Sequence, residues 1–431
     1  MEIEKEINSE LEIKGNPKLT SNIILLLLGR LVSLFGSQIY NFAIGLYVLK
    51  TTGSSAAFSM TLVFGMLPRI ILGPVAGVIS DRVDRKKIVV AMDILSGVVI
   101  FALAAVASIN GLKVSYIYIA NLLLNTCNTF FDIPMGASIP NIVDDKSLVK
   151  VNSLNQAVSS MAQIGGPFLG GIIFALVDIK LFLVVNAISF VLSGISEMFI
   201  DFNLNKVEKE DKNREKDKVI KGFSEEFKEG FTFLKGRKVL SIIFGFSIFL
   251  NFFLALGVTV PFPYIVNNII NLSPKKFGIL EAMIPLGMMI GSIILSMLPE
   301  KEKKYKSLVI GIMFISVTCI SIALPVLPRF VELSKSVHFI YYIIFLLIGG
   351  ISIVYVNIPI FVIMQRETPD NIRGRIFGLL QTIAMGINPI GLILSGLLIE
   401  KIPVYILPVA SGIIMIFITL LMASNKEIKT I

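Results

Sequence analysis

The chain has 431 residues, of which 55% are hydrophobic and only 16% are charged, and its mean hydropathy is +0.82. Soluble domains carry about 25% charged residues and a smaller apolar share, so this composition excludes a soluble protein and indicates an integral membrane protein. The net charge of +9 does not predict a nucleic-acid partner, because the basic residues do not cluster on a soluble domain.

Unbroken apolar runs of about 20 residues predict transmembrane helices, whereas a β-barrel would give short alternating segments. The polar first 20 residues predict no removable signal peptide. In chain order, we expect spans at residues 22–48, 56–80, 88–108, 114–139, 148–175, 180–201, 239–266, 274–298, 307–325, 338–364, 375–399 and 403–424. The expected fold class is an all-α membrane protein with 12 transmembrane helices.

The spans fall into two groups of six, which predicts an N-terminal six-helix lobe (1–201), a cytoplasmic linker (202–238) and a C-terminal six-helix lobe (239–431). Phe223, Phe227 and Phe231 recur at helical spacing in the linker and indicate an amphipathic helix, with a solvated charged loop as the alternative.

The two halves also resemble each other when they are shifted by 225 positions. The shift aligns identical residues over 39 positions without a gap, among them Pro134 with Pro359 and Gly171 with Gly396. Such a match indicates two pseudo-symmetric lobes related by duplication.

The distribution of basic residues predicts the orientation in the membrane. With the N-terminus inside, 29 Lys and Arg lie in inner segments or at the inner ends of spans, 8 lie in outer loops or at the outer ends of spans, and 2 lie deeper within spans. The positive-inside rule therefore predicts a multi-pass protein of the cell membrane with both termini in the cytoplasm.

A short, strongly charged loop follows the second span and holds a candidate gate motif. Gly77 allows close helix packing, and Asp81 can accept hydrogen bonds from the N-terminus of a neighbouring helix. Arg82, Arg85 and Lys86 can bridge acidic groups and lipid phosphates. The alternative is a basic loop that only fixes topology.

The fifth span carries a glycine-proline motif made of Gly166, Pro167, Gly170 and Gly171. Glycines one turn apart allow helices to approach closely, and proline removes one backbone hydrogen bond and permits a bend. The motif therefore predicts either a hinge or a tight packing seam.

Charged residues inside the spans are candidates for coupling or substrate binding, because each is costly in hydrocarbon unless it is paired or faces water. Arg30 and Asp132 lie at similar depth, and we expect them to form a buried pair that is either proton-sensitive or static. Asp93 is expected to join the charge network of the basic loop, Glu197 to extend toward the cytoplasmic surface, and Glu281 to take a proton or bind a cationic compound.

The chain offers little for metal, redox or hydrolytic chemistry. Cys127 and Cys319 lie about 190 residues apart within spans, and His338 is the only histidine. We expect no metal site, no cofactor and no enzymatic activity, and the absence of a phosphate-binding Gly-x-x-x-x-Gly-Lys motif excludes an ATPase in this chain.

The loop Gly77–Lys87 resembles the loop between helices 2 and 3 of the major facilitator superfamily. The helix 5 motif resembles that of its drug/proton antiporters, and the runs Gly374–Phe377 and Pro389–Gly396 resemble the bacterial macrolide-efflux branch. The resemblance implies the major facilitator fold, with Asp81 near the start of helix 11 at Thr368–Arg375.

The same resemblance implies a function for the chain. It implies a monomeric secondary transporter in the lipid bilayer that exports small hydrophobic substrates in exchange for protons by alternating access. A dedicated exporter of a siderophore or another metabolite is the alternative, and an importer is a third option.

Overall fold

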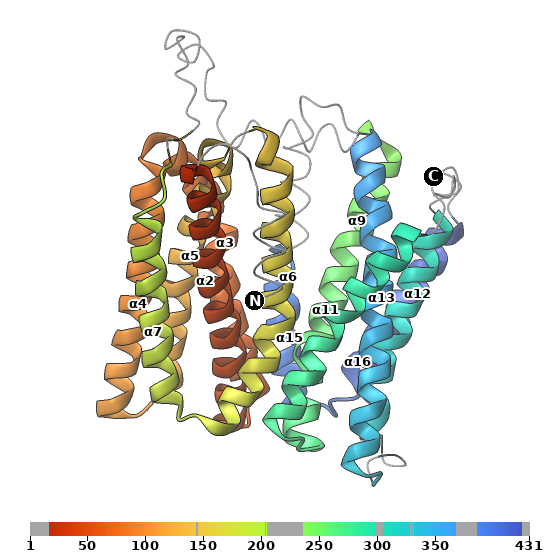
Figure 1. Ribbon diagram of the computed structural model, residues 1–431. Coiled ribbons are helices and arrows are strands. Elements are labelled where there is room, and N and C mark those ends of the chain that lie inside the picture. Colours follow the sequence, from red (N-terminus) through yellow and green to blue (C-terminus); the bar gives the residue numbers. More distant parts are fainter. Residues whose placement is uncertain are drawn as a thin grey trace. The chain divides into compact units, whose positions relative to one another are not determined.

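The computed structural model describes residues 17–143, 145–202, 204, 236–297, 305–327, 330, 332–367 and 386–424. All regular secondary structure in these ranges is helical (Figure 1). The helices of the first half are α2 (Pro17–Thr52), α3 (Ser55–Arg82), α4 (Arg85–Asn110), α5 (Val114–Ile142), α6 (Asp145–Leu176) and α7 (Ile179–Glu197). Those of the second half are α9 (Lys238–Leu254), the π-helical turn η1 (Ala255–Thr259), α10 (Pro261–Tyr264), the π-helical turn η2 (Ile265–Ile269), α11 (Pro274–Met297), α12 (Tyr305–Ala323), the 3₁₀ turn η3 (Leu324–Val326), α13 (Lys335–Glu367), α15 (Asn388–Ile399) and α16 (Ile406–Ser424).

Ten helices or helix runs in the described ranges are long and apolar enough to cross a membrane, which confirms the all-α membrane fold. The predicted span 375–399 is described only from residue 386 onward. Several helices extend beyond their predicted ends. For example, α2 has 36 residues and is about 54 Å long, because hydropathy marks only the roughly 30 Å that crosses the hydrocarbon.

The predicted span 239–266 is helical but not a uniform α-helix. Two π-helical turns flank α10, which contains Pro261 and Pro263. Proline cannot donate the intrahelical hydrogen bond, so the backbone between these turns departs from regular α-helical bonding. Hydropathy carries no signal for this change of helix type.

The chain divides into two compact units. The first comprises Met1–Tyr40, Ile71–Gly166 and Val177–Lys216, and the second comprises Asn41–Ile70, Pro167–Leu176 and Asp217–Ile431. Helices α2, α3 and α6 therefore each contribute to both units. The predicted linker falls largely outside the described residues, and the division into two six-helix lobes remains a prediction.

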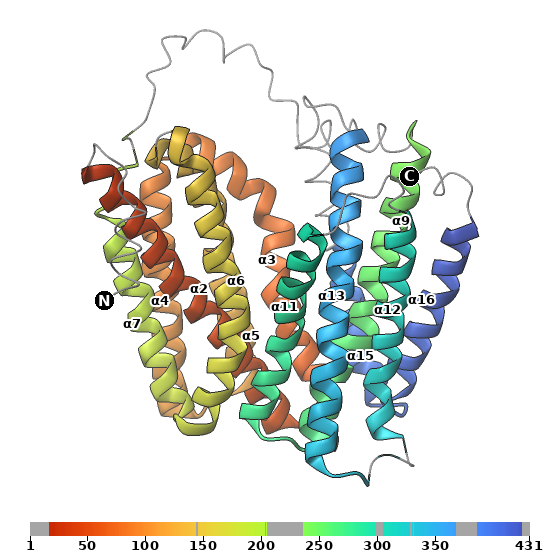
Figure 2. The same cartoon turned by 45° about the vertical axis from the view of Figure 1, so that its right-hand side comes forward.

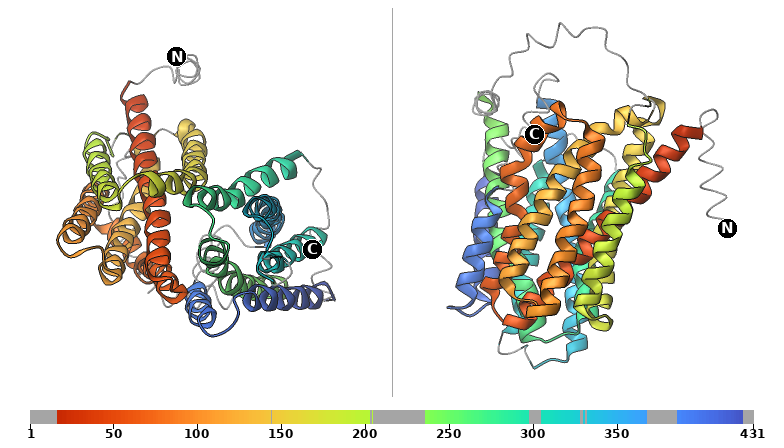
Figure 3. Two further views of the ribbon diagram at one scale, coloured as in Figure 1. Left: turned by 90° about the horizontal axis from the view of Figure 1, so that it is seen from below. Right: turned by 90° about the vertical axis from the view of Figure 1, so that its left-hand side faces the viewer.

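In the first unit, α4 and α7 run side by side (Figure 3). Glycines allow this approach: a Cβ atom built on Gly97 would lie 2.9 Å from the carbonyl oxygen of Ala187, and one on Gly194 would lie 3.3 Å from the backbone nitrogen of Ile94. Small residues at such crossings let two backbones pack directly in a membrane.

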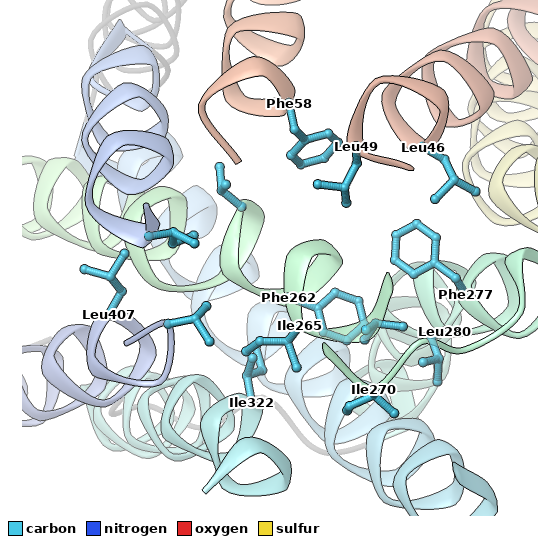
Figure 4. Close-up of a cluster of buried hydrophobic side chains, with 14 of the residues drawn as sticks. Leu46, Leu49, Phe58, Phe262, Ile265, Ile270, Phe277, Leu280, Ile322 and Leu407 are labelled. Atoms are coloured by element: carbon cyan, nitrogen blue, oxygen red, sulfur yellow. The ribbon is translucent and has the colours of Figure 1, made fainter. Parts of the chain in front are cut away.

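In the second unit, α13 packs against both α11 and α12, and α12 packs against α16 (Figure 2). The α11–α13 contact again relies on glycine, since a Cβ atom built on Gly287 would lie 3.1 Å from the Cα atom of Gly350. A cluster of buried apolar side chains joins α2, α3, α11, α13 and α15 in this unit (Figure 4).

Candidate functional site

The charged loop between α3 and α4 is a tight turn, because α3 ends at Arg82 and α4 begins at Arg85. Asp84 caps α4: its carboxylate accepts hydrogen bonds from the backbone nitrogens of Lys86 at 2.9 Å and Lys87 at 3.4 Å. A carboxylate at this position satisfies exposed N–H groups and stabilises the positive end of the helix.

The basic side chains of this loop bind the ends of other helices in the first unit. Arg85 donates from Nε to the carbonyl oxygen of Ser80 at 3.1 Å and from Nη1 to that of Ala137 on α5 at 2.7 Å. Lys86 donates from Nζ to the carbonyl oxygen of Ile200, just after α7, at 2.9 Å. These bonds place positive charge near helix C-termini, where the helix dipole favours a cation. The expected partners are acidic groups and lipid phosphates, whereas the acceptors of these three bonds are backbone carbonyl oxygens.

The structure shows fewer contacts for the other members of the predicted gate motif. Arg82 is exposed. No described atom lies within 4 Å of a Cβ atom built on Gly77, so the expected tight packing at this glycine is not found in the described part of the chain. The side chain of Asp81 and residues 368–385, its predicted partner region, lie outside the described residues.

The glycine-proline motif of α6 packs closely against α2. A Cβ atom built on Gly165 would lie 2.7 Å from the Phe35 ring, and one built on Gly170 would lie 2.8 Å from the Phe42 ring. A Cβ atom built on Gly166 would meet Gln38. Helix α6 continues through Pro167 without interruption. The packing supports the seam interpretation of the motif, and bending at Pro167 remains a prediction.

Gly171 makes the first of two close crossings in the second unit, between α6 and α11. A Cβ atom built on Gly171 would lie 2.6 Å from the carbonyl oxygen of Pro274 and 3.1 Å from the Cα atom of Gly278. A Cβ atom on Gly278 would in turn meet the carbonyl oxygen of Pro167. The two backbones are therefore in direct contact.

The second close crossing joins α3 and α15 at Gly396. A Cβ atom built there would lie 3.0 Å from the Cα atom of Ala56 and would meet the Ser59 hydroxyl group. The Ser55 hydroxyl group donates to the carbonyl oxygen of Gly396 at 2.7 Å. We refer to the contacts of Gly171 and Gly396 as the glycine crossings. They involve residues that the half-repeat aligns, 225 positions apart.

Hydrogen bonds reinforce this end of the second unit. The carboxylate of Glu400, directly after α15, accepts from the Ser54 hydroxyl group and from the backbone nitrogen of Ala56, the latter at 3.3 Å. Asn268 donates from Nδ2 to the carbonyl oxygen of Gly53 at 3.2 Å. The turn between α2 and α3 is thus bound to both η2 and α15.

Aromatic rings of α2, α10, α11 and α13 also pack together in the second unit. The rings of Phe42 and Phe277 stack with centroids 5.2 Å apart, and Phe262 lies 6.1 Å from Phe277 and 5.4 Å from Tyr342. In Figure 4, Leu46 and Phe277 lie on facing helices of the same cluster. The end of the second unit where α2 meets α3 is therefore closed by apolar packing.

A buried charge cluster lies in the first unit and consists of Arg30 on α2, Asp93 on α4 and Glu197 at the end of α7. Asp93 is 2% exposed and accepts a hydrogen bond from Ser33 at 2.8 Å. This bond comes from α2 and not from the basic loop. Glu197 is 0% exposed, so its expected extension toward the surface is wrong. The cause is packing against α2, where a Cβ atom on Gly29 would lie 3.7 Å from Cγ of Glu197.

The remaining candidates occupy two different helices. Asp132 on α5 interacts electrostatically with Asp93, whereas Arg30 acts on Glu197. The expected pair between Arg30 and Asp132 remains a prediction. Glu281 on α11 is half-buried, and no hydrogen bond joins it to another described residue. No group of three or more metal-ligating side chains occurs in the described ranges.

Comparison with known proteins places these features in context. Residues 26–388 match the sequence profile of the Major Facilitator Superfamily. The chain is 27% identical to macrolide efflux protein A of Streptococcus pyogenes, over 93% of this chain and 95% of that protein. It is 24% identical to the multidrug efflux pump Tap of Mycolicibacterium fortuitum, over 87% and 88% of the two chains. A bacterial homologue of the iron transporter ferroportin in an inward-facing state has a similar structure, with a TM-score of 0.69 and 16% identity over 94% of this chain and 98% of that one.

Proposed function

This chain belongs to the major facilitator superfamily and is a secondary transporter, and from that premise we propose that it exports small hydrophobic molecules, macrolide-like compounds among them, in exchange for protons. The observation that carries the proposal is the similarity to macrolide efflux protein A, which extends over almost the full length of both chains. A likeness restricted to single helices would support the fold alone.

The geometry of the second unit supports this proposal. With both termini in the cytoplasm, as the basic residues predict, the turn between α2 and α3 faces the outside. On that orientation, the glycine crossings and the aromatic packing lie on the outer side. An exporter must pass through a state that is closed on this side and takes up substrate from the cytoplasm, and the geometry fits such a state.

Inside-out membrane vesicles provide the test. Vesicles that contain the protein should accumulate a radiolabelled macrolide when their interior is acidified, because protons leaving the vesicle drive the exchange. Accumulation should disappear when an ionophore collapses the pH gradient. Tetraphenylphosphonium, a permanent lipophilic cation, serves as a second substrate that does not itself carry a proton.

A matched pair of variants controls for nonspecific binding. Gly396→Val places two methyl groups in the α3–α15 crossing and should abolish accumulation, whereas Gly245→Val falls where no described atom lies within 4 Å and should preserve it. Accumulation that ignores the gradient would refute proton coupling. A lack of accumulation for both compounds would refute export of this class.

A further inference from the structure

Glu197 occupies an unfavourable site for a negative charge. It is the last residue of α7, and its side chain is 0% exposed. Neither of its carboxyl oxygens has a hydrogen-bond partner among the described residues. A helix C-terminus carries a partial negative charge, which repels a carboxylate. A buried carboxylate without donors is therefore stable only if a cation neutralises it or if it carries a proton.

A second carboxylate lies beside it. Gly194 is in contact with Asp93, since a Cβ atom built on it would lie 3.5 Å from Cβ of Asp93, and Glu197 follows one helical turn later. The Coulomb interaction between Asp93 and Glu197 is repulsive. Two acids held this close in an apolar interior cannot both keep their charge at low cost.

Serine hydroxyl groups stabilise only one of the two acids. Ser33 donates to Oδ2 of Asp93 at 2.8 Å and lies 2.9 Å from the Ser193 hydroxyl group, which in turn donates to the carbonyl oxygen of Gly29 at 3.1 Å. These bonds favour the ionised form of Asp93. Glu197 receives no comparable hydrogen bond from the described residues.

Arg30 supplies one positive charge for two negative ones. Its Nε and Nη1 atoms are buried without a hydrogen-bond partner among the described residues, and its charge attracts Glu197. From α5, Asp132 and Cys127 also interact with Asp93. Among the described residues, the charges that face the two acids thus leave at least one negative charge uncompensated.

We propose that Asp93 and Glu197 form a binding site for one proton, which resides on Glu197 in the state described here. Proton binding adds hydrogen to one carboxyl oxygen of Glu197 and removes its negative charge, so that Arg30 no longer faces two ionised acids in Asp93 and Glu197. On release of the proton, Glu197 becomes a carboxylate and binds the unpaired nitrogens of Arg30. The proton-dependent partner of Arg30 is thus on α7.

Helix α2 gives this site a connection to substrate transport. Arg30 lies on α2, and the same continuous helix carries Phe42 and Leu46 into the closed end of the second unit. Pairing of Arg30 with Glu197 would shift α2 and so change the packing at that end. This coupling step rests on the proposed function, whereas proton binding itself does not.

The first measurement tests proton binding without transport. Full-length protein labelled with ¹³C at the glutamate Cδ atoms is reconstituted in liposomes at neutral pH and studied by solid-state NMR. We expect a resonance of a protonated carboxyl group that is absent in Glu197→Gln. Glu332→Gln, which removes an exposed acid, should lose intensity only among the ionised carboxylates.

The result for the acid resonance decides the proposal. A wild-type spectrum without any acid resonance, or a total acid intensity that is the same in Glu197→Gln as in the wild type, would overturn it. Because the first outcome is read from the wild-type protein, it does not depend on whether a variant folds.

The second measurement tests coupling in the inside-out vesicles. Glu197→Gln, which is permanently neutral, should still exchange labelled for unlabelled macrolide without a gradient, but its gradient-driven accumulation ratio should fall to about one, meaning no accumulation. Asp178→Asn is the matched control on the same helix, because asparagine keeps the N-cap that Asp178 provides and accumulation should stay at the wild-type ratio.

The two measurements separate the two proposals. Full gradient-driven accumulation in Glu197→Gln would overturn the role of this site in coupling. If the wild-type protein fails to accumulate the macrolide but shows the Glu197 acid resonance, the proposed function fails and the proton site stands.

Discussion

Replacing Gly171 by alanine should weaken the α6–α11 crossing and shift the protein away from the closed state of its second unit. The added Cβ atom would lie 2.6 Å from the carbonyl oxygen of Pro274, which belongs to the backbone and cannot rotate away. Overpacking of this kind costs about 1–3 kcal/mol. Such a cost lowers the ratio of closed to open molecules by about 5- to 150-fold.

The assay is a distance measurement between spin labels in the full-length protein in liposomes. Lys50→Cys and Lys401→Cys place labels at exposed positions in α2 and after α15. The natural cysteines Cys127 and Cys319 are buried and take up little label. In the Gly171→Ala protein, we expect a second population with a longer distance between the labels.

Gly245→Ala is the control for the loss of a helical glycine, because the new methyl group meets no described atom within 4 Å. Its distance distribution should match that of the parent protein. The reasoning fails if Gly171→Ala gives the parent distribution, or if both variants shift equally.

Three further predictions concern the charged loop. Arg85→Ala removes the hydrogen bonds to carbonyl groups of α3 and α5 and should lower the free energy of unfolding by about 1–3 kcal/mol. Thermal unfolding in detergent measures the loss, and Lys87→Ala, which changes an exposed side chain, should have little effect. Asp84→Ala removes the N-cap of α4 and should lower the free energy of unfolding by about 1 kcal/mol, whereas Asp84→Asn keeps a capping oxygen and should preserve it. Equal losses in the two variants would argue against capping. Asp81→Asn should slow transport while leaving membrane insertion and abundance largely unchanged, and normal turnover in vesicles would contradict a gating role.

Much of the fold could be predicted from the sequence, because hydrophobic length is a strong signal in a membrane protein. Hydropathy predicts the apolar part of α2 at 22–48, and the structure adds residues at both ends, so that α2 runs Pro17–Thr52. The π-helical turns around α10 could not be predicted, since apolar residues and two prolines fit several local geometries.

The candidate site was predictable in composition but less so in its contacts. The spacing of Gly166 to Gly171 predicted close packing, whereas the partner Gly278 is more than 100 residues away and carries no local signal. Arg85 binds backbone carbonyls, which no side-chain pattern marks. Glu197 was expected at the surface because it ends a span, and only the packing of α7 against α2 and α4 reveals its burial.

The glycine crossings also bear on the origin of the chain. Gly171 meets the start of α11 at Gly278. Gly396, which lies 225 residues after Gly171, meets the start of α3 at Ala56. Ala56 follows Gly53, which the same shift aligns with Gly278. In a dimer with two-fold symmetry, a residue i of one subunit touches j of the other, and j touches i. The two crossings approximate this form, with one half of the chain in place of each subunit, although Gly396 meets Ala56 and Ser59 and not Gly53. Each half therefore carries both sides of the contact, as expected if the closed end descends from the interface of an ancestral homodimer that predates the fusion of the halves.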